Sequence, residues 1–442
     1  MNIQKFFDLA AAKGITQSQV MVSNSKSTKI SLFRREIDTY KLSESRSMVA
    51  IGIYNGKLGS GATELVGDEA FDFLIEQIIL TATYSEKPCE VGLYEGAEKY
   101  KRPKTINKEL ALVPLEKKIA ELRQLEEDIL AYDPRIVEAD NVTYTEAESH
   151  GEYFNSHGIH LKTSSNSFYF LGGAVAKEGE ETKTFYDIYL GEDYSKFDRQ
   201  ALVKSICEKA LSKFGGKPCA SKKYPTVLHR DIVGDLIAYF LDNTIAEKVQ
   251  KKTSALEGKI GQKIASSKLT IEQKPLEKGF YYSTFDDELV PCKNFAIVKN
   301  GVLQTYLYNR ETAAKDGVET TANGVWGGSK FSTTCGPLYI KPGKKSFDEM
   351  IAPIKEGVYI TEIAGLGTGM NSTSGDFSCQ AEGYMIEDGK VTTPLNLITI
   401  SGNLFKLLND IKEFDSNAGM LPNGSAISVG DCYIKSLNIG GE

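Results

Sequence analysis

The chain has 442 residues, which is too long for a single ordinary hydrophobic core, so two or three domains are expected. Apolar residues make up 41% and charged residues 25%, as in soluble globular proteins, and no apolar run approaches the roughly 20 residues that span a bilayer. The net charge of −7, without a basic tract, argues against nucleic acid or an anionic membrane as the main partner.

The N-terminal stretch and the cysteines both indicate the cytoplasm. Residues 1–9 carry an acidic residue within their apolar stretch and lack a small-residue cleavage pattern, so no signal peptide is expected. The seven cysteines are odd in number and form no Cys-x-x-Cys pair, which is typical of a reducing compartment. They are Cys89, Cys207, Cys219, Cys292, Cys335, Cys379 and Cys432.

Residues 1–88 are expected to form a first unit of helices and strands. Apolar residues recur at helical spacing from residue 3 until Gly14. Short strands are predicted at 20–22, 31–33 and 37–42. Asn55-Gly56, between two further strands, predicts a β-hairpin. Asp68 is expected to cap the helix that follows.

A polar stretch, residues 87–108, resembles a linker or an exposed excursion, and a second unit is expected at 109–218. Pro114 suits the first turn of a helix predicted over residues 114–132. Strands follow, and Asp198 is expected to cap a closing helix. The first two units therefore share one plan of a helix, antiparallel strands and a helix.

Residues 222–442 are expected to form a strand-rich third unit. A strand at 226–228 leads into a long helix predicted over 231–251. Asn300-Gly301 and Asp388-Gly389 predict further hairpins. Helices that alternate with antiparallel strands predict an α+β fold, with a mixed N-terminal half and a strand-rich C-terminal domain.

The glycine-rich segment, residues 365–378, is the most informative part of the chain. Its glycines alternate with hydroxyl and amide residues between two predicted strands. Glycine tolerates positive φ and allows a ligand or another backbone to approach closely. Long polar loops inside compact domains are usually functional or disordered. Because this one runs directly into a strand, we predict an ordered loop that lines a site.

Among the four histidines, only His229 is placed for metal chemistry. It lies between a strand and the long helix, as the first histidine of a zinc-protease helix would. Its neighbour is Arg230, and the residue five positions on is Gly234. Arginine neither accepts a proton nor binds a cation, and catalytic zinc normally has three protein ligands. A histidine that starts or packs the helix is therefore the simpler interpretation.

Other catalytic patterns are absent or incomplete. No Gly-x-Ser-x-Gly precedes a suitable histidine and acid, which argues against a Ser-His-Asp hydrolase. The glycine-rich segment lacks the Lys-Ser/Thr ending of a phosphate loop. Cys379 is a candidate nucleophile or metal ligand, although a lone cysteine beside a strand is more often a small buried hydrophobe. Asp286-Asp287-Glu288 could hold a divalent cation, but an exposed strand end is the simpler explanation.

Motifs along nearly the whole chain resemble the TldD/PmbA family, also called modulators of DNA gyrase. Residues 30–40 resemble the family's opening domain, and Tyr153-Phe-Asn-Ser-His-Gly158 resembles its Asn-Ser-x-Gly turn. The C-terminal motifs are the most specific: Gly357-Val-Tyr-Ile-Thr-Glu362, Ser374-Gly-Asp-Phe-Ser378, Gly383-Tyr-Met-Ile-Glu-Asp-Gly389 and Ile400-Ser-Gly-Asn403.

The resemblance implies membership of the metal-free PmbA/TldE arm. TldD-like subunits carry His-Glu-x-x-x-His and a later cysteine that completes a zinc site. The three helix positions of that motif fall here on His229, Arg230 and Gly234. Cys379 lies about one residue away from the position of the family's ligand cysteine, and a shift of one residue in a strand turns a side chain to the other face. The resemblance therefore implies no catalytic residue, metal or cofactor in this chain, with zinc in a TldD-like partner.

By resemblance, this arm pairs with a TldD-like protease subunit, or with itself as a homodimer, in a cytoplasmic complex that degrades unfolded peptides. Free backbone groups beside a strand can bind a peptide by β-augmentation. The candidates for peptide binding or an interface are Gly365, Gly367, Gly369, Asn371, Asp376, Phe377 and Cys379.

Two alternatives stay open. One is a stand-alone metallopeptidase with a non-standard site built on His229 and Cys379. Arg230 weighs against it, because activation of water needs a base at that position. The other is a regulatory protein that modulates DNA gyrase. The lack of a basic surface weighs against direct action on DNA but not against binding to the gyrase protein.

Overall fold

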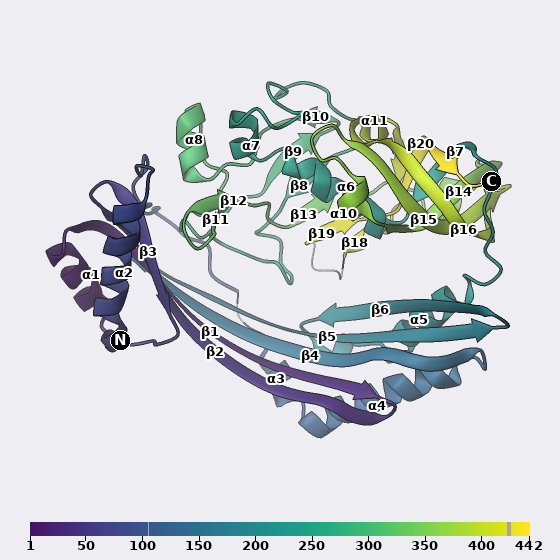
Figure 1. Ribbon diagram of the computed structural model, residues 1–442, viewed down its shortest axis with the longest axis horizontal. Coiled ribbons are helices and arrows are strands. Elements are labelled where there is room, and N and C mark those ends of the chain that lie inside the picture. Colours follow the sequence, from purple (N-terminus) through teal and green to yellow (C-terminus); the bar gives the residue numbers. More distant parts are fainter. Residues whose placement is uncertain (105, 422–425) are drawn as a thin grey trace.

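A long, curved antiparallel sheet forms the N-terminal half of the protein (Figure 1). The computed structural model describes residues 1–104, 106–421 and 426–442. The strand order is β3-β2-β1-β4-β5-β6. The bounds are β1 (Ile15–Phe33), β2 (Glu36–Tyr54), β3 (Lys57–Thr63), β4 (Ile136–Asn155), β5 (His160–Glu178) and β6 (Glu181–Gly191). Because β1 pairs with β4 from Gln19 and Asn155 to Ser31 and Thr143, this one sheet joins the predicted units 1–88 and 109–218.

The first two strands are far longer than the sequence predicts. The predicted short strands at 20–22 and 31–33 both lie within β1, which has 19 residues. The part of β1 between them is polar and lacks a buried apolar face, so it shows no alternation to recognise. Backbone pairing with β2 and β4 on both sides holds it extended. The Asn55-Gly56 hairpin is confirmed, with φ of 49° and 72° at its two turn residues.

Helices cover this sheet at two places and give it two cores. Near its start, α1 (Ile3–Ala12) and α2 (Phe71–Tyr84) bury Phe6 and Phe71, whose rings meet edge to face at 5.4 Å. Farther along, α4 (Leu115–Ala131) and α5 (Arg199–Leu211) pack on the sheet around Phe170, and the short α3 (Lys108–Leu112) adds Leu110. The helix predicted over residues 114–132 is therefore confirmed as α4.

One predicted helix cap is confirmed and one is wrong. The Asp198 carboxylate accepts a hydrogen bond from the Ala201 N–H, as an N-cap does. Asp68 instead opens a short 3-10 turn (Asp68–Ala70), and α2 begins after it without a side-chain cap. The Asp68 carboxylate is already engaged, since it accepts the backbone N–H of Asn2 at 2.9 Å.

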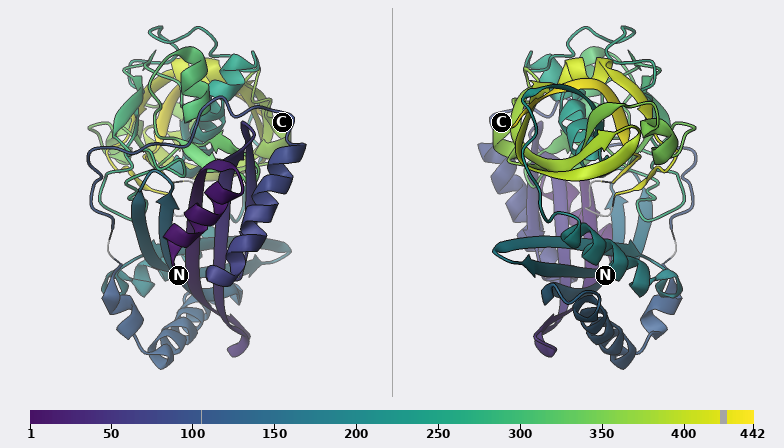
Figure 2. Two further views of the ribbon diagram at one scale, coloured as in Figure 1. Left: turned by 90° about the vertical axis from the view of Figure 1, so that its left-hand side faces the viewer. Right: turned by 90° about the vertical axis from the view of Figure 1, so that its right-hand side faces the viewer.

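A closed β-barrel dominates the C-terminal half and appears as a ring in Figure 2. Its sheet order is β16-β15-β14-β7-β20-β17, and pairing of β16 with β20 closes the ring. The bounds are β7 (Lys222–Leu228), β14 (Glu356–Ala364), β15 (Asp376–Glu387), β16 (Lys390–Asn403), β17 (Ile411–Phe414) and β20 (Cys432–Gly440). The Asp388-Gly389 hairpin is confirmed between β15 and β16.

A second sheet packs beside the barrel in the order β10-β9-β8-β13-β19-β18. Its strands are β8 (Ile271–Gln273), β9 (Phe295–Lys299), β10 (Val302–Leu303), β13 (Leu338–Ile340), β18 (Gly419–Met420) and β19 (Ile427–Val429). A two-stranded ribbon consists of β11 (Gly324–Trp326) and β12 (Phe331–Thr333). The short helices are α8 (Arg310–Asp316), α9 (Phe347–Ile351), α10 (Leu366–Gly369) and α11 (Leu404–Asn409). The Asn300-Gly301 hairpin is confirmed between β9 and β10.

The single helix predicted over residues 231–251 is wrong, because the chain forms two helices there. They are α6 (Arg230–Asp242) and α7 (Ala246–Gln250). Between them the backbone leaves the helix to bond with Leu307, whose N–H donates to Thr244 and whose carbonyl accepts from Ala246. The α+β class itself is confirmed: antiparallel sheets with packed helices make up both halves. Within the described part of the chain, no helix combines the length and apolarity needed to cross a membrane.

Candidate functional site

The first turn of α6 holds the residues that align with a zinc-protease helix. His229 directly follows β7 and is the N-cap of α6, with its Nδ1 atom 3.4 Å from the backbone nitrogen and 3.2 Å from Oδ2 of Asp231. Its side chain is only 17% exposed. The ring therefore serves the start of the helix, which agrees with the simpler interpretation of this histidine.

Arg230 belongs to a polar cluster that the barrel strands supply. Its backbone N–H donates to Oδ1 of Asp431 at 2.8 Å, and the Tyr359 hydroxyl donates to Oδ2 at 2.8 Å. Burial, followed by the nearby Asp431 charge, raises the pKa of Tyr359, so this hydroxyl keeps its proton. Asp415 lies beside Asp431, and burial raises the pKa of its carboxyl as well.

Gly234 faces the core with almost no free space. It is buried in α6, and a Cβ atom at this position would lie 2.3 Å from Cδ1 of Leu421. Leu421 is fully buried, so it cannot simply swing into solvent. A histidine at residue 234 would require this part of the core to repack.

The donor atoms near α6 do not fit a catalytic zinc ion. Neither Arg230 nor Gly234 has a side chain that binds a metal ion. Over residues 1–104, 106–421 and 426–442, no three His, Cys, Asp or Glu side chains gather closely enough to hold a metal ion.

The glycine-rich segment is folded back on the start of β15. Gly365 has a left-handed φ of 78° and begins α10, a single helical turn. Met370 then forms a bridge with Phe377, and the Asn371 N–H donates to the Asp376 carbonyl at 2.9 Å. The predicted loop is therefore ordered, and the segment itself covers this stretch of β15. Addition of a peptide strand there would require the segment to move away.

Side-chain hydrogen bonds fix the tip of the segment. The Asn371 side chain accepts the N–H groups of Thr373 and Ser374. The Asn403 amide donates to the Asp376 carboxylate at 2.9 Å, and this bond is the main reason that the pKa of Asp376 is lowered. The segment also meets α6, since the Asn243 amide donates to the Ser372 carbonyl at 2.8 Å.

The seven predicted contact residues divide into exposed and buried sets. Gly365, Gly367, Asn371 and Asp376 are exposed, and Gly369 is half-buried. Phe377 and Cys379 are each 4% exposed and belong to the barrel core. Burial raises the pKa of the Cys379 thiol, which disfavours a reactive thiolate. The next residue, Gln380, is exposed, as expected for the opposite side of the strand.

The structure does not bring the two groups of predicted residues together through direct contacts. His229 stands just before the first residue of α6, and the glycine-rich segment bonds to Asn243, just beyond the last. Fourteen residues separate them, about 21 Å along a helix.

The acidic run at residues 286–288 is not an exposed strand end, so that prediction is wrong. It forms a tight loop in which Glu288 is only 6% exposed and the next residue, Leu289, has a φ of 66°. Backbone N–H groups of Gly324, Trp326 and Arg310 donate to the three carboxylates. Because these donors lie far along the sequence, the composition of the run could not reveal its burial.

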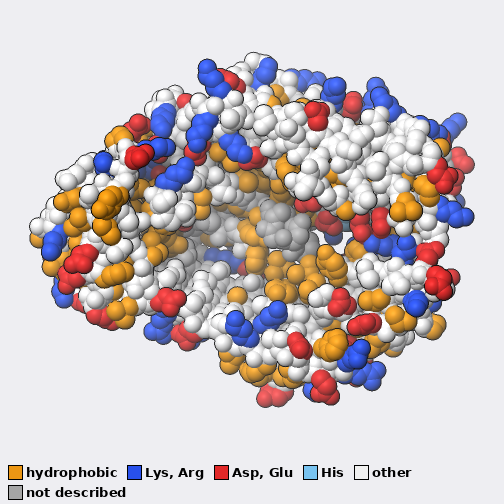
Figure 3. Space-filling view, viewed as in Figure 1, with side chains coloured by type: hydrophobic (Ala, Val, Ile, Leu, Met, Phe, Trp, Pro, Cys, Tyr) orange, Lys and Arg blue, Asp and Glu red, His pale blue; other side chains and the backbone are white. Residues whose placement is uncertain are grey.

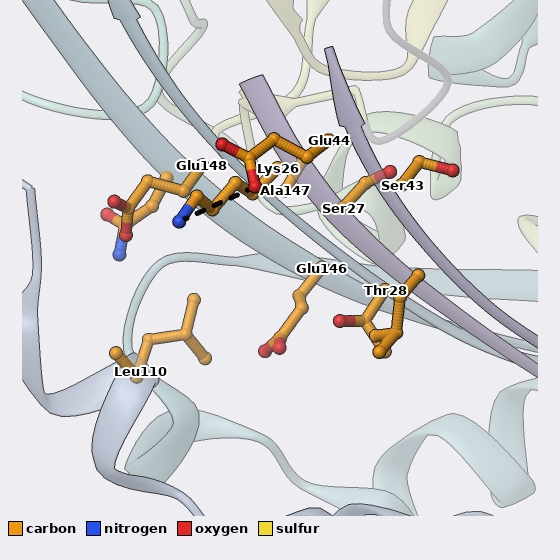
Figure 4. Close-up of a pocket in the computed structure, with 12 residues that line it drawn as sticks. Lys26, Ser27, Thr28, Ser43, Glu44, Leu110, Glu146, Ala147 and Glu148 are labelled. Carbon is orange, nitrogen blue, oxygen red and sulfur yellow. Dashed lines mark ion pairs between the residues drawn. The ribbon is translucent and has the colours of Figure 1, made fainter. Parts of the chain in front are cut away.

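The molecule is hollowed between the N-terminal sheet and the C-terminal half (Figure 3). A separate hollow of about 470 Å³ lies on the N-terminal sheet beside α3, and Figure 4 shows its Lys26–Glu44 pair near Glu146 and Leu110. Glu146 is engaged in the fold, since it accepts hydrogen bonds from Lys118 and Tyr144. None of the predicted site residues lines this hollow.

Sequence patterns identify only some of the residues that complete the α6 site. Tyr359 lies inside one of the family-like motifs, and Asn403 ends another. Asp431 and Leu421 lie outside every motif and reach the site only through pairing in the barrel and the second sheet.

Comparison with known proteins gives consistent matches over most of the chain. Residues 221–441 match the PmbA/TldA metallopeptidase C-terminal domain, and residues 108–214 match the PmbA/TldA metallopeptidase central domain. The chain is 23% identical to a metalloprotease PmbA homolog of Haemophilus influenzae over 98% of this chain and 94% of that protein.

Two crystal structures share the entire fold. A proposed modulator of a DNA gyrase from Thermotoga maritima superposes with a TM-score of 0.90 and 26% identity, covering 99% of both chains. TldE from Thermococcus kodakarensis superposes with a TM-score of 0.91 at 21% identity, covering 99% of this chain and 100% of that one. With both family domains matched in order, this chain belongs to the TldD/PmbA family.

Proposed function

We propose that this chain is a PmbA/TldE-like, non-catalytic subunit of a cytoplasmic zinc metalloprotease complex. In this proposal a TldD-like partner holds the zinc ion, and the complex cleaves unfolded peptides. The observation that carries it is the first turn of α6. There Arg230 stands where a catalytic base is needed, and Gly234 stands where a second histidine is needed.

The packing of this turn supports the proposal beyond the residue types. Leu421 fills the space that a side chain at position 234 would enter. The backbone of Arg230 is tied to Asp431, which Tyr359 also holds. A catalytic zinc site would need an open position for water or substrate beside three ligands. The packed core here favours a structural role for this end of the helix.

Two of the matched proteins carry names of the PmbA/TldE arm, although a relative from Saccharolobus solfataricus is named as a TldD homolog. The Haemophilus relative is named as a PmbA homolog, and the Thermococcus structure is of TldE. In our proposal the exposed residues of the glycine-rich segment contact either the partner subunit or the peptide. Contact through the side chains of Asn371 and Asp376 and the exposed backbone of α10 fits the observed geometry better than strand addition, because the segment already pairs with β15.

Metal analysis and a peptidase assay on the same preparation test the proposal. The full chain, purified without chelator, is expected to hold far less than one zinc ion per chain and to leave an unfolded peptide intact. Addition of a TldD-like subunit is expected to give zinc-dependent cleavage and a stable complex in sedimentation. Stoichiometric zinc together with chelator-sensitive cleavage by this chain alone would instead establish the stand-alone metallopeptidase.

A further inference from the structure

A cavity of about 840 Å³ lies where the two halves of the molecule meet, well within the size range of ligand pockets. One wall is the irregular segment 85–94, and the other comes from α7, α8 and the loop after β11. These elements lie on the side of the C-terminal half nearest to α2 and β3 (Figure 1). Neither the start of α6 nor the glycine-rich segment contributes to this cavity.

Two buried hydrogen-bond acceptors line the cavity. Gln19, in β1, is 0% exposed, and its amide nitrogen donates to the Asp287 carbonyl at 2.9 Å. Its Oε1 atom has no hydrogen-bond partner. Glu288 is 6% exposed, and its Oε2 atom accepts the Arg310 N–H at 2.8 Å. A buried acceptor without a donor destabilises the fold, so such an atom commonly marks a missing partner.

Five basic residues line the cavity, and four of them, all except Lys87, are engaged with other partners. The Arg310 guanidinium donates to the Gly92 carbonyl and lies over the Tyr94 ring at 5.5 Å. Lys315 pairs with Glu311 and Glu90, and Lys251 and Lys330 both pair with Glu247. Within the described chain, the carboxyl group of Glu288 has no ion pair.

We propose that this cavity binds an organic cation, a ligand with a primary ammonium or guanidinium group whose N–H groups donate to Gln19 Oε1 and the Glu288 carboxylate. Both groups are donors only, which matches two acceptors. Neither acceptor can hydrogen-bond an anion, and among the described residues no group of three His, Cys, Asp or Glu could hold a metal ion. The cation is either a basic peptide side chain or a free amine. The inference does not depend on the proposed protease complex.

Proton release is expected to accompany binding. Burial raises the pKa of Glu288 to about 7; the Arg310 backbone N–H and charge oppose this shift, and the charges of Glu311 and Asp287 add to it. The Glu288 charge in turn adds to the burial that raises the pKa of the neighbouring Asp286. A bound cation favours the ionised carboxylate, so affinity should fall up to about tenfold per pH unit below 7.

Isothermal titration calorimetry tests the proposal by titrating capped single amino acids and a diamine into the full chain at pH 8. N-acetyl-lysine amide and N-acetyl-arginine amide are the cationic probes, N-acetyl-norleucine amide is the neutral probe of similar shape, and cadaverine represents free amines. We expect at least one cationic probe to bind with a Kd of about 10 mM or tighter, and the neutral probe to bind at least tenfold more weakly. Preference for the capped residues assigns a peptide side chain, and preference for cadaverine assigns a free amine.

Variants locate the site. Glu288→Gln keeps an acceptor for the Arg310 N–H but removes the charge, and it should weaken binding about tenfold or more. Gln19→Met removes the second acceptor at similar size and gives an independent test if the first variant folds poorly. Glu90→Gln removes an acid of the same cavity that already pairs with Lys315, and it should bind like the parent.

The proposal is overturned by any of three results. The first is that none of the cationic probes binds, and the second is that the neutral probe binds as tightly as the cationic ones. The third is that Glu288→Gln and Gln19→Met both keep the affinity of the parent.

Discussion

Glu288 is a carboxyl group that the fold holds almost entirely out of water. Its pKa is about 7 in the folded chain, against an ordinary value of 4.5, because burial disfavours the charged form. An acid with a raised pKa stabilises the fold only while it is protonated. That contribution is fully present below pH 4.5 and is lost as the pH rises to about 7.

We therefore predict a stability effect of Glu288→Gln that grows with pH. Between pH 5 and pH 8, the free energy of unfolding of the variant should rise relative to that of the parent by about 2–3 kcal/mol, because glutamine carries no charge to bury. Urea unfolding of both proteins at the two pH values, without added amine, measures this difference. A gain that is the same at both pH values would show that Glu288 is not held in its protonated form.

At the scale of elements, the close contact of α2 with β3 depends on glycine. A Cβ atom on Gly59 would lie 2.0 Å from the Ile78 carbonyl oxygen and 2.8 Å from the Ala82 backbone nitrogen. Both atoms belong to the backbone of α2, which can yield only if the whole helix moves. Helix α2 also supplies Phe71, Leu74, Ile75 and Ile78 to the first core, so this docking closes that core.

Gly59→Ala is expected to destabilise the protein by about 1–3 kcal/mol, the usual cost of overpacking. Thermal unfolding followed by circular dichroism provides the measurement. Gly367→Ala is the matched control, because a Cβ atom there meets only the Tyr239 hydroxyl at 3.9 Å, and its midpoint should stay close to that of the parent. Equal midpoints for the two variants would argue against tight docking of α2.

Elements that depend on local signals were predictable from the sequence, and those that depend on distant partners were not. The Asn55-Gly56 turn, the Asp198 cap and α4 all follow from neighbouring residues. The full length of β1 does not, because its polar middle is held between β2 and β4, and β4 lies more than 100 residues away. In the candidate site, His229 and Arg230 were recognisable as a motif, whereas Leu421 and Asp431 reach them only through the tertiary fold.

At the scale of the whole molecule, the long sheet ties the first 88 residues to the next hundred. Strand β1 lies between β2 and β4, and its far end supplies Ile30 and Leu32 to the core beneath α4 and α5. A chain that stopped at residue 88 would leave this edge unpaired and these side chains exposed.

We predict that residues 1–88 alone do not fold cooperatively, whereas residues 1–216 do. The longer fragment retains all six strands and both cores of the sheet. Thermal melts followed by circular dichroism distinguish the two cases, with a sharp transition expected only for the longer fragment. A sharp transition of the short fragment would mean that the first core is sufficient by itself.

The closure of the barrel sets an order of events during protein synthesis. Strand β7 (Lys222–Leu228) pairs with β14 and with β20, whose residues follow it by more than 120 and about 200 positions. At about 5–20 residues per second, the ribosome needs roughly 10–40 s to deliver β20 after β7. The N-terminal sheet can assemble in that interval, but β7 stays an open edge until β20 arrives. Slow translation of the last 200 residues should therefore increase the need for chaperones, because the barrel cannot close before its last strand is synthesised.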